Sequence, residues 1–121
     1  MNEFKNSIII YQPHADQPAI DVRLESATVW LSQRQMADLF DVDVRTISEH
    51  LSNVFSSGEL EKEATIRKFR IVRREGTRNV TRSVEHYNLD AIISVGYRVK
   101  SATATQFRIW ATKRLREYLV Q

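Results

Sequence analysis

A chain of 121 residues with 42% hydrophobic residues is long enough for one domain with a modest core. Cysteine is absent, which excludes disulfides and thiolate zinc sites, and no segment is apolar and long enough to cross a membrane, so we expect a cytoplasmic protein. The net charge of +3 is the sum of an acidic half and a basic half. Residues 1–63 carry five Lys and Arg against eleven Asp and Glu, and residues 64–121 carry thirteen Lys and Arg against four Asp and Glu. This asymmetry favours a polyanionic partner for the second half.

The chain begins with a predicted layer of three strands. Residues 7–11 form a short apolar run, typical of a buried strand, and residues 20–24 alternate apolar and polar side chains, typical of a half-buried one. Residues 25–27 are suited to a turn, and residues 28–31 to a return strand.

Residues 31–55 have the layout of a helix-turn-helix, two short helices joined by a tight turn. Ser32 and Gln35 have the spacing of a capping box, which predicts a helix that starts directly after Ser32. Asp41 occupies a turn position that is often glycine, and aspartate tolerates the left-handed conformation better than most residues do. Asp43 is the expected cap of the second helix. The alternative is an ordinary helical hairpin that packs a small core.

The second of these helices has an apolar face and a polar face. The apolar side chains are Ile47, Leu51, Val54 and Phe55. The side chains expected to read DNA base edges are Arg45, Thr46, Glu49 and Asn53. Residues 32–57 nevertheless carry two Arg against four Asp and Glu, so most of the affinity for phosphates would have to come from other parts of the chain.

A basic β-hairpin is predicted next. Residues 65–74 and 80–87 are rich in β-forming residues and are separated by a turn at residues 75–79. Between Arg67 and Arg82 the chain holds seven basic residues and one acid, Glu75. The arginines expected to bind phosphates are Arg70, Arg73, Arg74, Arg78 and Arg82, with Arg78 at the tip. The alternative is an exposed strand edge kept soluble by charge. A hairpin directly after a helix-turn-helix predicts a winged helix.

Two helices are predicted at the C-terminal end. Asn88 can cap a helix over residues 89–99, in which Gly96 costs on the order of 1 kcal/mol relative to alanine unless close packing requires it. A break is expected at residues 100–103, followed by a final helix. The apolar stripe of that helix consists of Phe107, Trp110, Ala111, Leu115, Tyr118 and Leu119.

The apolar stripe of the final helix is wider than the surface that one neighbouring helix would cover. Part of it is therefore a candidate interface, either with a second copy in a homodimer or with a region beyond residue 121. The alternative is core packing, with Phe107 and Trp110 reaching the first strand layer. The helix is still in phase at Leu119 and has no terminating residue, so we expect the chain to be the N-terminal part of a longer protein.

Catalytic and metal-binding patterns are weak. His14, His50 and His86 lie far apart in the sequence, and the three glycines form no phosphate-cradling loop. No nucleophile-elbow pattern surrounds a serine. Trp30 and Trp110 fall in apolar stripes, where core packing is more common than base stacking. We therefore expect no enzyme activity, no metal site and no cofactor.

Three segments carry a family resemblance: WLSQRQMADLF (residues 30–40), YNLDAIISVGYRV (87–99) and FRIWAT (107–112). They resemble the RhuM-type virulence-protein family, and FRIWAT is distantly similar to N-terminal domains of phage antirepressors. The resemblance implies a bacterial, cytoplasmic protein with a DNA-binding-like domain, longer in full-length members, and it supplies no catalytic residues.

The sequence as a whole predicts an α+β fold over residues 1–121, a single winged helix-turn-helix domain with an N-terminal strand layer and two C-terminal helices. We expect a DNA-binding domain with a role in transcription regulation and double-stranded DNA as its partner. The alternative is a protein–protein interaction module of a virulence or mobile-element protein without direct DNA binding. A third, weaker hypothesis is a nucleic-acid enzyme whose catalytic part lies beyond residue 121.

Overall fold

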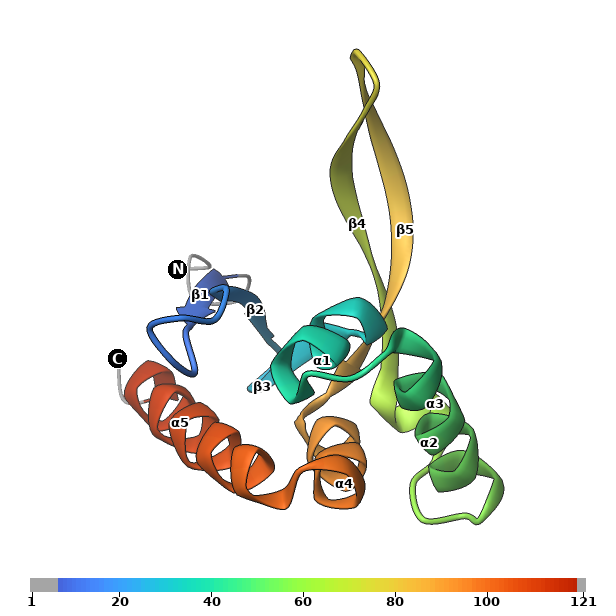
Figure 1. Ribbon diagram of the computed structural model, residues 1–121, viewed down its shortest axis with the longest axis vertical. Helices are drawn as coiled ribbons and strands as arrows, with labels where there is room; N and C mark the ends of the chain where they lie inside the picture. The colour runs from blue at the N-terminus through green and yellow to red at the C-terminus, as the bar shows by residue number, and fades with distance from the viewer. Residues whose placement is uncertain (1–6, 120–121) are drawn as a thin grey trace.

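The computed structural model describes residues 7–119, except for the side chain of Leu119. Over these residues the chain forms a five-stranded antiparallel sheet, in the order β1-β2-β3-β5-β4, and five helices (Figure 1). The α+β class is therefore confirmed.

The first three strands form a meander: β1 (Ser7–Tyr11), β2 (Ile20–Glu25) and β3 (Thr28–Ser32). All three match the predicted strand layer to within one residue. Ser26 and Ala27 form the two-residue turn between β2 and β3, with φ of 56° and 60°. A turn with both central residues in the left-handed region matches the natural twist of paired strands, so these residues accept an uncommon conformation.

Helix α1 (Gln33–Phe40) starts and ends as predicted. The Ser32 hydroxyl accepts the backbone N–H of Gln35 at 3.2 Å, and the Gln35 side chain accepts the N–H of Ser32 at 2.9 Å. These two bonds form the capping box. Asp41 ends the helix in the left-handed conformation, with φ 58° and ψ 52°, which permits the tight turn into the next helix.

Helix α2 (Val44–Ser56) buries the predicted face through Ile47, Leu51 and Val54. Asp43 occupies the N-cap position with extended backbone, but its carboxylate makes no capping hydrogen bond, so that part of the prediction was wrong. The backbone conformation of the turn alone starts the helix.

The connector after α2 contains a one-turn helix that was not predicted, α3 (Lys62–Thr65). The hydroxyl of Thr65 donates to the carbonyl of Glu61 at 2.9 Å, and the side chain is buried. Thr65 therefore closes this turn. The sequence predicted that Thr65 begins the strand, but β4 starts one residue later.

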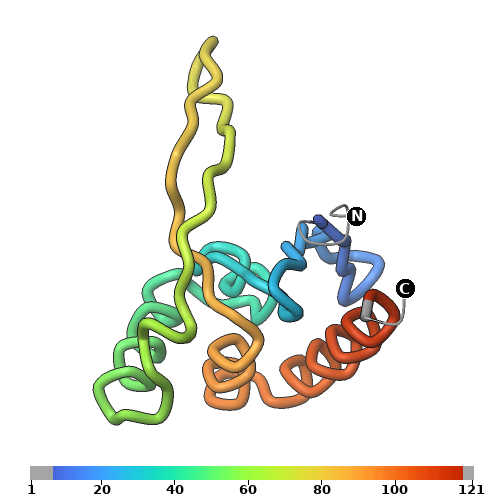
Figure 2. Tube along the Cα trace, turned by 180° about the vertical axis from the view of Figure 1, so that it is seen from behind, coloured from blue at the N-terminus to red at the C-terminus, as the bar shows by residue number. Residues whose placement is uncertain are grey.

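The hairpin consists of β4 (Ile66–Glu75) and β5 (Arg78–Asn88). The two strands pair along their whole length, and the turn is confined to residues 76–77, with Gly76 at φ 63°. The turn is thus shorter than predicted. The inner end of β5 also pairs with β3, so the hairpin continues the main sheet while its outer part projects far from the rest of the molecule (Figures 1 and 2).

Two further helices follow, α4 (Leu89–Val99) and α5 (Ser101–Leu119). The side chain of Asn88 caps α4 by accepting the N–H three residues later at 3.1 Å, as predicted. Only Lys100 separates the two helices. The helical hydrogen bonds of α5 begin at this residue, because the carbonyl of Lys100 accepts the N–H of Ala104 at 3.0 Å. The predicted four-residue break was therefore too long.

The core lies where α1, α4 and α5 pack against one face of the sheet. Gly96 of α4 allows this close approach, because a Cβ atom there would lie 2.5 Å from Cζ of Phe40 and 2.7 Å from Cβ of Ala104. The predicted packing role of Gly96 is confirmed.

The aromatic residues of α5 contact the first strand. The ring of Tyr11 lies 5.2 Å from that of Phe107 and 4.7 Å from that of Trp110. These two members of the apolar stripe therefore take part in core packing, as the alternative interpretation held. Leu115 and Tyr118 are half-buried against the same core, and the side chain of Leu119 lies outside the described residues.

Candidate nucleic-acid interface

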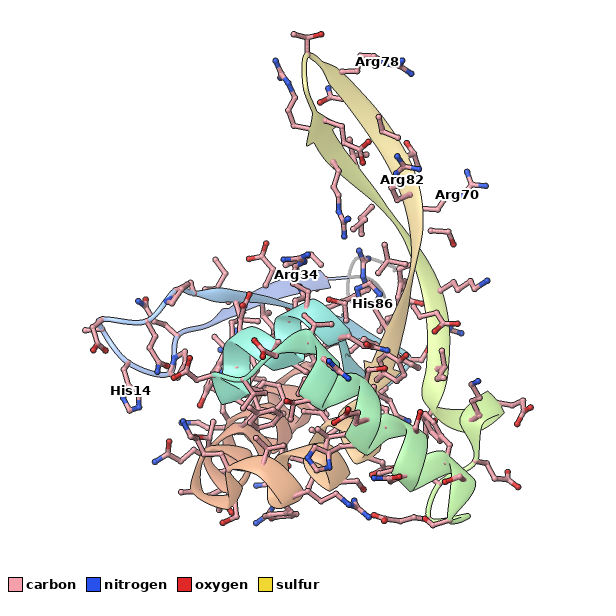
Figure 3. The ribbon with its side chains drawn as sticks, turned by 45° about the vertical axis from the view of Figure 1, so that its right-hand side comes forward. His14, Arg34, Arg70, Arg78, Arg82 and His86 are labelled. Atoms are coloured by element: carbon pink, nitrogen blue, oxygen red, sulfur yellow. The ribbon has the colours of Figure 1, made fainter. Side chains whose placement is uncertain are left out.

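The outer hairpin, defined as residues 70–82, carries all five arginines predicted to bind phosphates. The pleat and the strand register place Arg73, Arg78 and Arg82 on one face and Arg70 and Arg74 on the other. All five side chains are exposed. Because the outer hairpin projects from the body, both faces are accessible to a large ligand (Figure 3).

These arginines differ in their present partners. The guanidinium of Arg82 donates two hydrogen bonds to the carboxylate of Glu75, at 3.1 and 2.8 Å, and this pairing lowers the pKa of Glu75 and raises that of Arg82. Among the described residues, Arg70, Arg73 and Arg78 make no hydrogen bond or ion pair. The outer hairpin thus presents several guanidinium groups that need no rearrangement to bind an anion.

The foot of the hairpin is fixed to the first strands by arginine and aromatic contacts. Arg67 pairs with Glu25 at 2.6 Å, and its guanidinium lies 5.6 Å from the ring centre of Trp30. The guanidinium of Arg23 lies 4.6 Å over the ring of Phe69. Trp30 and Phe69 are both buried, so Trp30 serves packing here, as predicted, and holds the base of the hairpin in place.

His86 lies buried in the same region, with its ring 5.1 Å from that of Phe69. Burial lowers the pKa of His86 below its ordinary value, and the nearby Arg23 acts in the same direction, while the hydrogen bond to the Val84 carbonyl opposes them. His86 is therefore neutral at pH 7 and adds no charge to the arginines around it.

The side chains predicted to read bases lie along α2. Arg45, Glu49 and Asn53 are exposed, and Thr46 is half-buried. Arg45 and Glu49 form an ion pair at 3.6 Å, one turn apart. Such an exposed pair contributes little to stability, so both groups can exchange partners at low cost.

Helix α2 and the outer hairpin do not lie side by side. In both views α2 starts near the foot of the hairpin and runs away from its tip (Figures 1 and 2). The two predicted sets of DNA contacts therefore occupy separate parts of the surface, and the first turns of α2 are the part closest to the hairpin.

A cavity of about 780 Å³ lies between the C-terminal half of α2, the connector and the foot of the hairpin. Its apolar lining includes Leu51, Phe55 and Tyr87. Its charged lining consists of Glu61, Lys62, Glu63 and Glu85. This side of the molecule is thus acidic, in contrast to the outer hairpin.

Two arginines near the hairpin had no predicted role. Arg23 of β2 and Arg34 of α1 line a second cavity at the foot of the hairpin, together with Arg70 and Arg73. Arg34 and His86 lie on the same side of the hairpin, and the side chain of Arg70 points to the other side (Figure 3). The charge pattern in the sequence gave no signal for this cluster, because residues 1–63 are acidic as a whole.

Other kinds of site are not evident in the part of the chain that the structure describes. No group of three or more His, Asp or Glu side chains there is arranged to hold a metal ion. None of the helices formed by residues 7–119 is both long and apolar enough to span a bilayer.

The basic hairpin and the two helices after it are similar in sequence to a known protein family. The sequence profile of the Virulence protein RhuM family matches residues 64–121, which run from the end of α3 to the end of the chain. The match confirms the predicted resemblance to the RhuM-type family over these residues. No curated protein and no solved structure matches the chain.

Proposed function

We propose that the chain is a DNA-binding regulatory domain in which the outer hairpin binds the phosphates of a duplex. The observation that carries this proposal is the projecting hairpin, whose residues 70–82 hold five exposed arginines against one carboxylate. Arginine suits this role because its planar fork can bind two phosphate oxygens at once.

The order of the elements supports a winged helix-turn-helix in this role. The helix pair α1–α2 lies between β3 and the hairpin, and β3 pairs with β5, so the hairpin is anchored next to the helix pair. In this proposal the hairpin is the wing, and α2 presents Thr46 and Asn53 to base edges. The amide of Asn53 suits an adenine edge, which offers one donor and one acceptor.

In this proposal the hairpin and α2 have different roles in DNA binding. Phosphate contacts from the hairpin supply affinity for any sequence, and α2 supplies discrimination. Phosphate contacts release counterions, so the logarithm of the affinity should fall by about 0.9 per contact for each unit of log salt. Four or five contacting arginines predict a slope of roughly −4 to −5.

A pair of charge-matched variants tests the role of the hairpin. Replacing Arg74 and Arg78 with glutamine should weaken binding to all duplexes and make the salt slope shallower by roughly 2. The control replaces Lys113 and Arg116, two exposed residues of α5 that make no ion pair among the described residues. Equal losses in both variants would show that net charge alone, and not the hairpin, determines binding.

The acidic cavity favours a second candidate function. Three glutamates against one lysine, on a partly apolar surface, suit a basic and apolar segment of a protein partner. On this alternative, the chain is a protein–protein interaction module without direct DNA binding. A wild-type chain with no duplex affinity at about 50 mM salt would favour this alternative.

A further inference from the structure

A cavity of about 470 Å³ lies at the foot of the hairpin, and we call it the root cavity. Three parts of the chain form its walls: the first two strands, the start of α1, and the hairpin at residues 70–73 together with His86. Its charged lining residues are Arg23, Arg34, Arg73 and Asp21, and Arg70 also borders it, with a side chain on the opposite face of the hairpin. We propose that the root cavity is a second phosphate site, in which Arg34 and Arg73, beside Arg23, hold phosphodiester groups of the DNA backbone.

Among the residues that the structure describes, positive charge exceeds negative charge in the lining of the root cavity. Arg23, Arg34 and Arg73 line it together with one carboxylate, that of Asp21, and these residues come from well-separated positions in the sequence. Among the described residues, Arg34, Arg70 and Arg73 make no hydrogen bond or ion pair. Gathering like charges in a concave site is unfavourable for the folded protein by itself, and a bound anion reverses this effect. The arrangement therefore points to an anionic ligand.

The shape of the surface favours a chain of phosphates over a single small anion. A neighbouring cavity of about 380 Å³ shares three lining residues with the root cavity, Ser32, Arg34 and Arg73. The two hollows therefore meet at these residues, and the two arginines line both. An extended ligand can pass from one hollow to the other in contact with both guanidinium groups, as a nucleic-acid backbone does along a basic surface.

The walls of the root cavity are fixed before the ligand arrives. The guanidinium of Arg23 lies 4.6 Å over the ring of buried Phe69, and the buried ring of His86 is held by a 2.9 Å hydrogen bond to a backbone carbonyl. Arg34 stands in the first turn of α1, which the capping box holds in place. Preformed walls reduce the ordering cost of binding.

This inference rests on the proposed function and extends it in a specific way. It adds phosphate contacts from Arg23 and Arg34 of the body to those of the hairpin arginines. The DNA would then lie against the foot of the hairpin and the start of α1, close to the first turns of α2. That path connects the hairpin contacts with the helix that is proposed to read the bases.

The test measures duplex binding as a function of salt for the variant Arg34→Gln. This side chain is exposed and makes no hydrogen bond or ion pair with the described residues that the substitution would remove. Arg116→Gln on α5 is the control with the same change of charge. Arg34→Gln should make the salt slope shallower by about 0.9, a loss of roughly fivefold to tenfold in affinity at 0.1 M salt, and the control should change neither. Thermal melts of both variants check that the fold is intact.

The outcomes separate the inference from the proposed function. If Arg34→Gln binds like the wild type while Arg74→Gln with Arg78→Gln weakens binding, the outer hairpin binds DNA and the root cavity does not. If the wild-type chain has no duplex affinity, the proposed function fails first, and the inference fails with it.

A spectroscopic measurement locates the ligand directly. In NMR spectra, the ring signals of His86 should shift when a short duplex is added, while those of His14, in the loop after β1 and away from the hairpin, should not (Figure 3). Inorganic phosphate is the second probe. Shifts of His86 with millimolar phosphate but none with DNA would identify a site for small anions and overturn the inference.

Discussion

Replacing Gly96 with alanine should destabilise the protein, although alanine is the better helix former. Gly96 lies in the middle of α4, where helix propensity alone predicts a gain of about 1 kcal/mol for the alanine variant. The added Cβ, however, would lie 2.5 Å from Cζ and 2.8 Å from Cε1 of Phe40, and 2.7 Å from Cβ of Ala104. Phe40 and Ala104 are fully buried, so neither can move without displacing the core.

The size of the effect follows from these two opposing contributions. Overpacking of a core typically costs about 1–3 kcal/mol, and contacts this short place Gly96→Ala in the upper part of that range. After the gain in helix propensity, we expect a net loss of about 1–2 kcal/mol. For a domain of this length, that loss corresponds to a fall in Tm of roughly 4–8 °C in a thermal melt.

A double-variant cycle identifies the clash as the cause. Phe40→Leu removes the ring atoms that meet the new methyl group, so the cost of Gly96→Ala should be smaller in the Phe40→Leu background, by at least about 0.5 kcal/mol. If the Gly96→Ala variant is as stable as the wild type or more stable, the result would contradict the close packing of α4 against α1 and α5.

Three further predictions concern the surface. Glu75→Gln should free Arg82 from its ion pair, so duplex affinity should rise and the salt slope should steepen by about 0.9; a weaker complex would show that Glu75 positions Arg82 for binding. Thr46→Ala and Asn53→Ala should cost about 1–3 kcal/mol of discrimination between duplexes in competition assays, and unchanged sequence preference would exclude α2 as the reader. If the far end of the α5 stripe is a dimer interface, Tyr118→Glu should shift sedimentation at tens of micromolar from dimer to monomer, whereas a wild-type monomer would leave this stripe to core packing alone.

Local rules in the sequence predicted most of the secondary structure. The capping box at Ser32, the left-handed Asp41 and the cap at Asn88 each depend on one side chain and its nearest backbone neighbours, and all three are confirmed. The alternation of apolar residues likewise placed β2 correctly, because one face of that strand is buried.

The errors occurred where several local choices are possible. Asp43 was expected to cap α2 with its side chain, but the turn after Asp41 already starts the helix. The short helix α3 has no apolar period long enough to recognise, and Thr65 closes it through a bond to a carbonyl four residues earlier. Element boundaries depend on such competing hydrogen bonds.

The arrangement of charge was the hardest part to predict. The basic hairpin is visible in the sequence as a run of arginines, whereas the pairing of Arg82 with Glu75 depends on the register and twist of the two strands. The root cavity depends on the pairing of strands that are distant in the sequence, and Arg23 and Arg34 from the acidic half of the chain line it together with Arg73. The spacing of residues within one segment cannot predict a site that is built from several segments.

The salt dependence of duplex binding by the wild-type chain tests the central claim most directly. The claim is that the arginines of the hairpin hold phosphates, so binding to mixed-sequence duplexes should be measurable at about 50 mM salt. The logarithm of affinity should then fall against the logarithm of salt with a slope of roughly −4 to −5. Absence of binding at that salt concentration, or a slope near zero, would contradict the claim.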